Sequence, residues 1–288
     1  MIYNQSHRKN YGQDTMIHVK SEILNQNILN FKFTSFLALL IIITSCGPAK
    51  KTETAVEEDL ISYSVLRSMP HDMKAFTEGL LIHNGQLYES TGEYGSSWIG
   101  IVDINTGEAD KKVEFGQHHF GEGITILNNK VYHLTYKQHT GYVYDLTTFE
   151  EVNQFSFKNA EGWGMTNDGS SLIMSDGSDK LTFLDTVDFS VVKTLPVKYK
   201  SQPIKNLNEL EYVNVFIYAN IWETNRIAKI DAATGEVVGF MDLTTLVNQI
   251  RQLKSDADVL NGIAWHEATK TLLVTGKYWP LIYVLRVD

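Results

Sequence analysis

The chain lacks three things: a second cysteine, a basic cluster beyond its first fifty or so residues, and an apolar run long enough to cross a bilayer. Since a disulfide needs two cysteines, Cys46 alone excludes an intrachain disulfide. The formal net charge of −9 repels a phosphate backbone, so no nucleic-acid partner is expected. The 288 residues are 43% hydrophobic and 11% aromatic, which suffices for one large core.

The longest apolar run, residues 36–43, lies just before Cys46 and follows basic residues that include Lys32. This is the pattern of a secretory signal, and a cysteine at this place resembles the lipobox of bacterial lipoproteins. The resemblance implies a signal peptide over residues 1–45 and a lipid on Cys46. It also implies a place in the bacterial cell envelope, with this anchor as the only membrane contact. An uncleaved anchor or a chance cysteine is the alternative.

Residues 46–59 are polar and show no periodic pattern, which predicts a flexible tether. In the remaining part, residues 60–288, a β-rich run followed by aspartate and a turn recurs at Asp103, Asp145, Asp185 and Asp231. These aspartates lie 42, 40 and 46 residues apart. A period near forty, filled with short strands, is typical of four-stranded propeller blades. We interpret the aspartates as turn residues that bind nearby backbone amides, not as metal ligands.

Alternating apolar residues predict an all-β fold, a five-bladed β-propeller, whose last blade has only three strands of its own. Residues 61–66 alternate cleanly and stand alone before the first blade. Because a propeller must close its ring, we predict that this N-terminal strand completes the last blade. Residues 243–253 have the apolar spacing of a helix. A closed ring leaves few free strand edges, so a monomer is expected.

Five short motifs do not fit the turn pattern, and each stands just before the first strand of a predicted blade. They are Phe76-Thr77-Glu78-Gly79-Leu80, Phe120-Gly121-Glu122-Gly123-Ile124, Glu161-Gly162-Trp163-Gly164-Met165, Leu207-Asn208-Glu209-Leu210-Glu211 and Leu260-Asn261-Gly262-Ile263-Ala264-Trp265. Equivalent positions of successive blades converge at one mouth of the channel. The motifs therefore predict one pocket shared by Glu78, Glu122, Trp163, Asn208 and Asn261. The flanking glycines would let a ligand approach the backbone closely. Taken singly, each glutamate could instead serve a structural hydrogen bond.

From Met69 to Val287 the order of these motifs resembles the plant-type, papaya-like glutaminyl-peptide cyclotransferase family. Further matches are Glu-Ser-Thr-Gly at 89, Ser-Asp-Gly at 175, Ala-Asn-Ile-Trp at 219 and Val-Thr-Gly-Lys at 274. The resemblance implies a five-bladed propeller enzyme without cofactor or catalytic metal. Its expected reaction converts the N-terminal glutamine of peptides to pyroglutamate with release of ammonia.

The same resemblance implies roles for individual residues. Glu122 is expected to be the general acid and base, and Lys277 the hydrogen-bond donor to the reacting oxygen. The expected substrate pocket also contains Phe76, Phe120, Tyr136, Trp163, Asn208 and Trp222.

Two positions depart from the papaya-like pattern. Glu78 replaces a glutamine of that pattern, and Tyr136 replaces a tryptophan. The tyrosine keeps an aromatic face, whereas the glutamate adds a charge. We hypothesise that Glu78 binds the α-ammonium of the substrate and, by like-charge repulsion, raises the pKa of Glu122.

Two other functions are compatible with parts of the pattern. One is a non-catalytic, lipid-anchored propeller that binds a ligand in the same pocket. The other is a metal-dependent propeller lactonase that uses the oxygens of Glu78, Glu122, Asn208 and Asn261 as ligands. Lys277 argues against the lactonase, because its ammonium would repel a bound cation.

Overall fold

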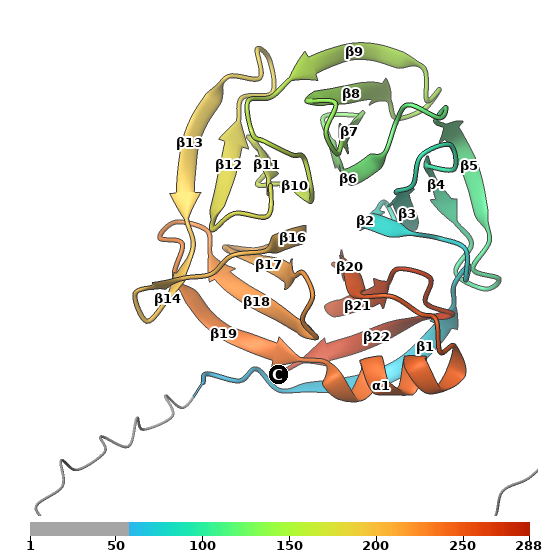
Figure 1. Ribbon diagram of the computed structural model, residues 1–288, viewed down its shortest axis with the longest axis vertical. Coiled ribbons are helices and arrows are strands. Elements are labelled where there is room, and N and C mark those ends of the chain that lie inside the picture. The colour runs from blue at the N-terminus through green and yellow to red at the C-terminus, as the bar shows by residue number, and fades with distance from the viewer. Residues whose placement is uncertain (1–57) are drawn as a thin grey trace, which may run out of the picture. The chain divides into compact units, whose positions relative to one another are not determined.

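The computed structural model describes residues 58–288, which form five four-stranded antiparallel sheets arranged as blades around one axis (Figure 1). The inner strand of each blade contacts the inner strands of both neighbouring blades, so the ring is closed. The five-bladed propeller predicted from the repeat is confirmed. The predicted signal peptide, Cys46 and nearly all of the predicted tether lie outside the described residues. Within residues 58–288 no helix is both long and apolar enough to cross a membrane.

Each blade runs from an inner strand at the axis to an outer strand at the rim. From the inner strand outward, the blades consist of β2 (Thr77–His83), β3 (Gln86–Thr91), β4 (Trp98–Val102) and β5 (Ala109–Glu114); β6 (Gly121–Leu127), β7 (Lys130–Thr135), β8 (Thr140–Asp145) and β9 (Glu151–Ser156); β10 (Met165–Asn167), β11 (Leu172–Met174), β12 (Lys180–Leu184) and β13 (Val191–Pro196); β16 (Leu207–Val213), β17 (Phe216–Ile221), β18 (Arg226–Asp231) and β19 (Val237–Asp242); and β20 (Leu260–His266), β21 (Thr271–Gly276), β22 (Leu281–Val287) and β1 (Tyr63–Pro70).

The N-terminal strand β1 closes the fifth blade by pairing antiparallel with β22, as predicted. It extends beyond the predicted residues 61–66 and ends at Pro70. A register shift between Val65 and Arg67 interrupts the alternation there, so the sequence pattern stops too early. Met69, in the missed part, is buried and packs with residues of β21 and β22. The closing strand therefore contributes to the core as well as to the ladder.

The repeated aspartates are turn residues, as interpreted. One carboxylate oxygen accepts a backbone N–H two residues on in each repeat, at 2.8 Å for Asp103, 2.9 Å for Asp145, 2.7 Å for Asp185 and 3.0 Å for Asp231. Each carboxylate thus stabilises the turn between the third and fourth strands of its blade. A short hairpin of β14 (Lys198–Tyr199) and β15 (Gln202–Pro203) lies outside the blades and was not predicted.

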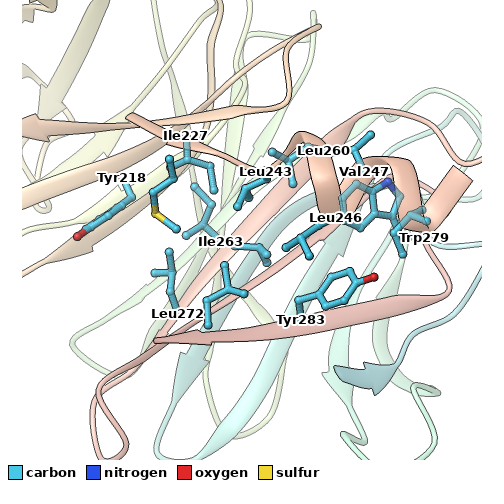
Figure 2. Close-up of a cluster of buried hydrophobic side chains, with 14 of the residues drawn as sticks. Tyr218, Ile227, Leu243, Leu246, Val247, Leu260, Ile263, Leu272, Trp279 and Tyr283 are labelled. Carbon is cyan, nitrogen blue, oxygen red and sulfur yellow. The ribbon is translucent and has the colours of Figure 1, made fainter. Parts of the chain in front are cut away.

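The helix α1 (Thr244–Leu253) covers part of blades 4 and 5, and its range agrees with the predicted 243–253. It buries Leu246 and Val247 in a cluster that also contains the fully buried Trp279 (Figure 2). The indole N–H of Trp279 donates to the carbonyl oxygen of Asp258 at 3.0 Å. Because Trp279 lies in the connection between β21 and β22, this core fixes the segment that carries Lys277.

Candidate active site

The inner strands of four blades are interrupted by a β-bulge at the same place. The pairing register shifts between Thr77 and Gly79, Gly121 and Ile124, Leu207 and Leu210, and Leu260 and Ile263. A bulge breaks the strict alternation of side chains and re-aims those beside it. The residues at the bulges are Glu78, Glu122, Asn208 and Asn261. The sequence placed these residues just before the inner strands. The structure corrects this, because all four lie inside the strands.

A pocket of about 400 Å³ opens at the end of the ring where the inner strands begin. It is lined by Phe76, Glu78, Phe120, Glu122, Tyr136, Trp163, Asn208, Trp222, Glu223, Asp258, Val259 and Lys277. All nine residues expected to catalyse the reaction or bind substrate are among them. Asn261 does not line the pocket, but its side-chain amide donates an N–H to the carboxylate of Glu78. Sequence reasoning missed Glu223, Asp258 and Val259, which lie in connections that carry no repeated motif.

Glu78 is held by two groups of the protein. The Nζ of Lys277 donates an N–H to Glu78 Oε1 at 2.6 Å, and the Nδ2 of Asn261 donates an N–H to Glu78 Oε2 at 3.0 Å. The side chains of Glu78 and Lys277 are only 2% and 7% exposed. Burial raises the pKa of Glu78 to about 7, although the charge of Lys277 opposes this. We expected Glu78 to bind the substrate's ammonium. In the structure both carboxylate oxygens of Glu78 already have a protein partner, and binding of the substrate's ammonium by Glu78 stays a prediction.

Glu122 differs from Glu78 in having no protein partner. Its side chain is buried, yet no group within residues 58–288 donates a hydrogen bond to its carboxyl. Burial is the main influence and raises the pKa of Glu122 well above its ordinary value. The charge of Glu78 raises this pKa further, in the direction that we hypothesised, and Lys277 lowers it. A carboxyl whose pKa is raised above its ordinary value holds a proton more readily, so it can both accept a proton and return it.

Asn208 presents an unused acceptor in the same pocket. Its side chain is 4% exposed, and its Oδ1 has no hydrogen-bond partner among the described residues. A buried acceptor without a partner costs free energy, of the order of 1–3 kcal/mol. A ligand that donates an N–H to this oxygen would remove that cost.

Aromatic rings form the walls of the pocket. Phe76 meets Phe120 edge to face with 6.0 Å between centroids, and Trp163 meets Trp222 in the same way at 5.5 Å. Tyr136 lies 5.5 Å from Phe120, so the tyrosine keeps an aromatic face where the papaya-like pattern has tryptophan. The walls exclude water from the polar groups between them, which strengthens their electrostatic interactions.

Glycines set the positions of these rings and of the inner strands. A Cβ at Gly92 would lie 2.4 Å from the Phe120 ring, and one at Gly177 would lie 2.6 Å from the Trp163 ring. A Cβ at Gly123 would lie 2.3 Å from the backbone nitrogen of Met165. The glycine beside Glu122 therefore lets a neighbouring inner strand approach, not a ligand, which corrects our interpretation of that motif.

Within residues 58–288 no three His, Cys, Asp or Glu side chains are grouped so that they could hold a metal ion. The pocket instead combines a partner-free carboxyl, an ammonium, an amide and aromatic walls at one end of a closed propeller. Carboxyl groups with raised pKa values, gathered in such a pocket, are typical of the active site of an enzyme.

Comparison with known proteins identifies the family. The glutamine cyclotransferase family model matches residues 37–287, and the chain belongs to this family. It is 36% identical to the glutaminyl-peptide cyclotransferase of Arabidopsis thaliana over 247 residues, which cover 84% of this chain and 77% of the relative. The crystal structure of Myxococcus xanthus glutaminyl cyclase is similar with a TM-score of 0.73 and 31% identity, over 81% of this chain and 99% of that one.

Proposed function

We propose that this protein cyclises the N-terminal glutamine of peptides to pyroglutamate and releases ammonia. The observation that carries the proposal is the carboxyl of Glu122, which is buried, faces the pocket and has no protein partner among the described residues. The family and the activity named for the two relatives support the same reaction.

In the proposed reaction the glutamine side chain enters the pocket and folds back toward its own α-amine. The Oδ1 of Asn208 accepts an N–H of the substrate's side-chain amide. Lys277 keeps one N–H on Glu78 and directs another to the amide oxygen. The attack is intramolecular, and holding the amine against the amide carbon in the folded-back conformation supplies much of the rate.

Glu122 then moves one proton in two steps. Its carboxylate accepts a proton from the α-amine as the nitrogen bonds to the side-chain amide carbon, and the carbonyl oxygen takes the negative charge. Lys277 stabilises that charge. Glu122 next gives the proton to the amide nitrogen, the carbon–nitrogen bond breaks, and ammonia leaves as the carbonyl re-forms. The raised pKa of Glu122 suits both transfers.

The test is an assay of ammonia release from a dipeptide that begins with glutamine, with mass spectrometry of the cyclic product. EDTA is included so that a metal-dependent reaction would be suppressed. Turnover under these conditions supports the proposal. Binding of the dipeptide without turnover would contradict it and favour the non-catalytic propeller.

Glu78→Gln should move the acid limb of the kcat/KM profile to lower pH. The variant removes a negative charge that raises the pKa of Glu122, so Glu122 ionises at lower pH and acts as a base there. The amide oxygen of the substituted side chain would still accept an N–H of Lys277, and the profile is measured below the Tm of the variant. The profile is measured with the same dipeptide, and Glu223→Gln is the control. Glu223 lines the pocket but does not influence the pKa of Glu122. An unchanged limb for Glu78→Gln would contradict this coupling.

We also propose that Cys46 carries a lipid that anchors the protein in the bacterial cell envelope. The support is the sequence around Cys46, where basic residues, an apolar run and small residues follow one another. Cells grown with a labelled fatty acid should transfer label to the wild-type protein and not to Cys46→Ser. If the wild-type protein carries no label, the proposal is wrong.

A further inference from the structure

A second buried ion pair lies beside the pair formed by Glu78 and Lys277, and the proposed reaction does not use it. His71 Nε2 is 3.0 Å from Glu89 Oε1, and the two side chains are 0% and 1% exposed. Neither residue lines the pocket. A buried ion pair is costly to form, so its presence alone is weak evidence that it stabilises the fold.

The hydrogen-bond partners limit how this pair can be protonated. His71 Nδ1 lies 2.8 Å from the carbonyl oxygen of Trp279, which can only accept, so Nδ1 carries a proton. His71 Nε2 then donates to an ionised Glu89 or accepts from its acid form, and the pair is neutral overall in both cases. Burial lowers the pKa of His71, but the charge of Glu89, the hydrogen bonds to Glu89 and to the carbonyl of Trp279, and the charge of Asp72 together outweigh this and raise it. Both ring nitrogens of His71 and one carboxyl oxygen of Glu89 therefore have hydrogen-bond partners within the protein.

The pair connects the two segments that carry Glu78 and Lys277. On one side, the hydroxyl of Thr77 donates to Glu89 Oε1 at 2.7 Å, and Thr77 immediately precedes Glu78. On the other side, His71 binds the carbonyl of Trp279, two residues after Lys277. The backbone N–H of His71 also donates to the carbonyl of Pro280 at 3.0 Å.

We propose that His71 and Glu89 are positioning residues, which hold the β21–β22 connection in register with β2 so that Lys277 reaches both Glu78 and the substrate oxygen. The proposal rests on the proposed function and adds two residues to it. A lysine side chain is flexible, so its reach depends on where its backbone is held. A displacement of about 1 Å in such a group can cost about 10²-fold in rate.

The test compares three variants in the ammonia-release assay. Glu89→Leu removes the link, and kcat per folded molecule should fall at least tenfold with KM little changed, because Lys277 acts on the transition state. Glu89→Gln can still bond both Thr77 and a neutral His71, so it should keep most of the wild-type kcat.

Glu211→Leu is the control. Glu211 is a half-buried carboxyl that accepts the backbone N–H of Trp265 at 2.7 Å, but it lies outside the pocket. This control should lower Tm and leave kcat unchanged.

Equal kcat for Glu89→Leu and Glu211→Leu would overturn the proposal and leave the pair a structural role only. If Glu89→Leu does not fold, Thr77→Val decides. Valine has nearly the same shape as threonine but lacks the hydroxyl that donates to Glu89, so the link from Glu89 to β2 is lost. An unchanged kcat in this variant would overturn the proposal. Crystal structures of the wild type and of the folded variant give a readout that needs no activity. Loss of the 2.6 Å contact between Lys277 and Glu78 supports the proposal, and its retention overturns it, even if the wild type proves inactive.

Discussion

Replacing Glu122 with glutamine should lower kcat by about 10²–10⁴-fold, the usual contribution of one positioned acid and base. Glutamine has the same shape but cannot take the proton of the α-amine or return it to the leaving nitrogen. Asn208 and Lys277 still contact the substrate amide, so KM should change little. The measurement is ammonia release from an N-terminal glutamine dipeptide by the purified variant.

The loss must come from chemistry and not from unfolding. Glu122→Gln should unfold at the wild-type Tm or above it, because a neutral amide replaces a buried carboxyl whose ionisation burial already disfavours. The matched control is Glu211→Gln. Burial raises the pKa of Glu211 to about 8, but the residue lies outside the pocket, so kcat should not change. If Glu122→Gln kept its kcat within a few-fold of wild type, Glu122 would not be the proton carrier.

The sequence predicted the fold well because each blade repeats the same four-stranded sheet, and four of the blades repeat the same aspartate turn. The spacing of Asp103, Asp145, Asp185 and Asp231 follows from one turn per blade, and a local hydrogen bond explains each aspartate. The closing strand was predictable because the last blade lacked one. The end of β1 was not, since the bulge near Arg67 breaks the alternation from which strands are inferred.

The pocket was predictable for a related reason, since equivalent positions of a ring meet at its axis. The sequence does not reveal which residues of the first and last blades pair where the propeller closes. Glu78 and Lys277 are 199 residues apart, and only the contact between the last and first blades brings them to 2.6 Å. The link from His71 through Glu89 depends on the same closure. Gly92 and Gly177 leave space for the aromatic side chains of Phe120 and Trp163, and no local sequence pattern specifies where those side chains lie.

Replacing Lys277 with methionine should lower kcat by about 10²–10³-fold, the usual cost of losing one donor to a developing oxyanion. Methionine keeps an unbranched stem near the Phe76 ring, over which the ammonium now lies at 4.3 Å, but it cannot donate to the reacting oxygen. The variant also leaves Glu78 without its cation. Removing one member of a buried pair typically costs about 3–5 kcal/mol of stability.

The stability loss has a defined pH dependence. The folded-state pKa of Glu78 is raised to about 7 even beside Lys277, and without the cation it should rise further. A carboxyl with a raised folded-state pKa favours folding when protonated, so the loss relative to wild type should be small in acid and grow as pH rises past about 7, where Glu78 ionises beside Lys277 but stays protonated without it. Tm measured across pH should therefore separate Lys277→Met from wild type mainly at neutral and alkaline pH.

The double variant Glu78→Gln/Lys277→Met separates the structural and catalytic roles of Lys277. It removes both charges, so Tm should return toward the wild-type value at neutral pH, whereas kcat should stay as low as in Lys277→Met. Recovery of kcat together with Tm would mean that Lys277 serves only to neutralise Glu78. Persistent loss of kcat in a stable protein would leave the ammonium itself as the group that the reaction needs, since the pocket offers no other cation among the described residues that line it.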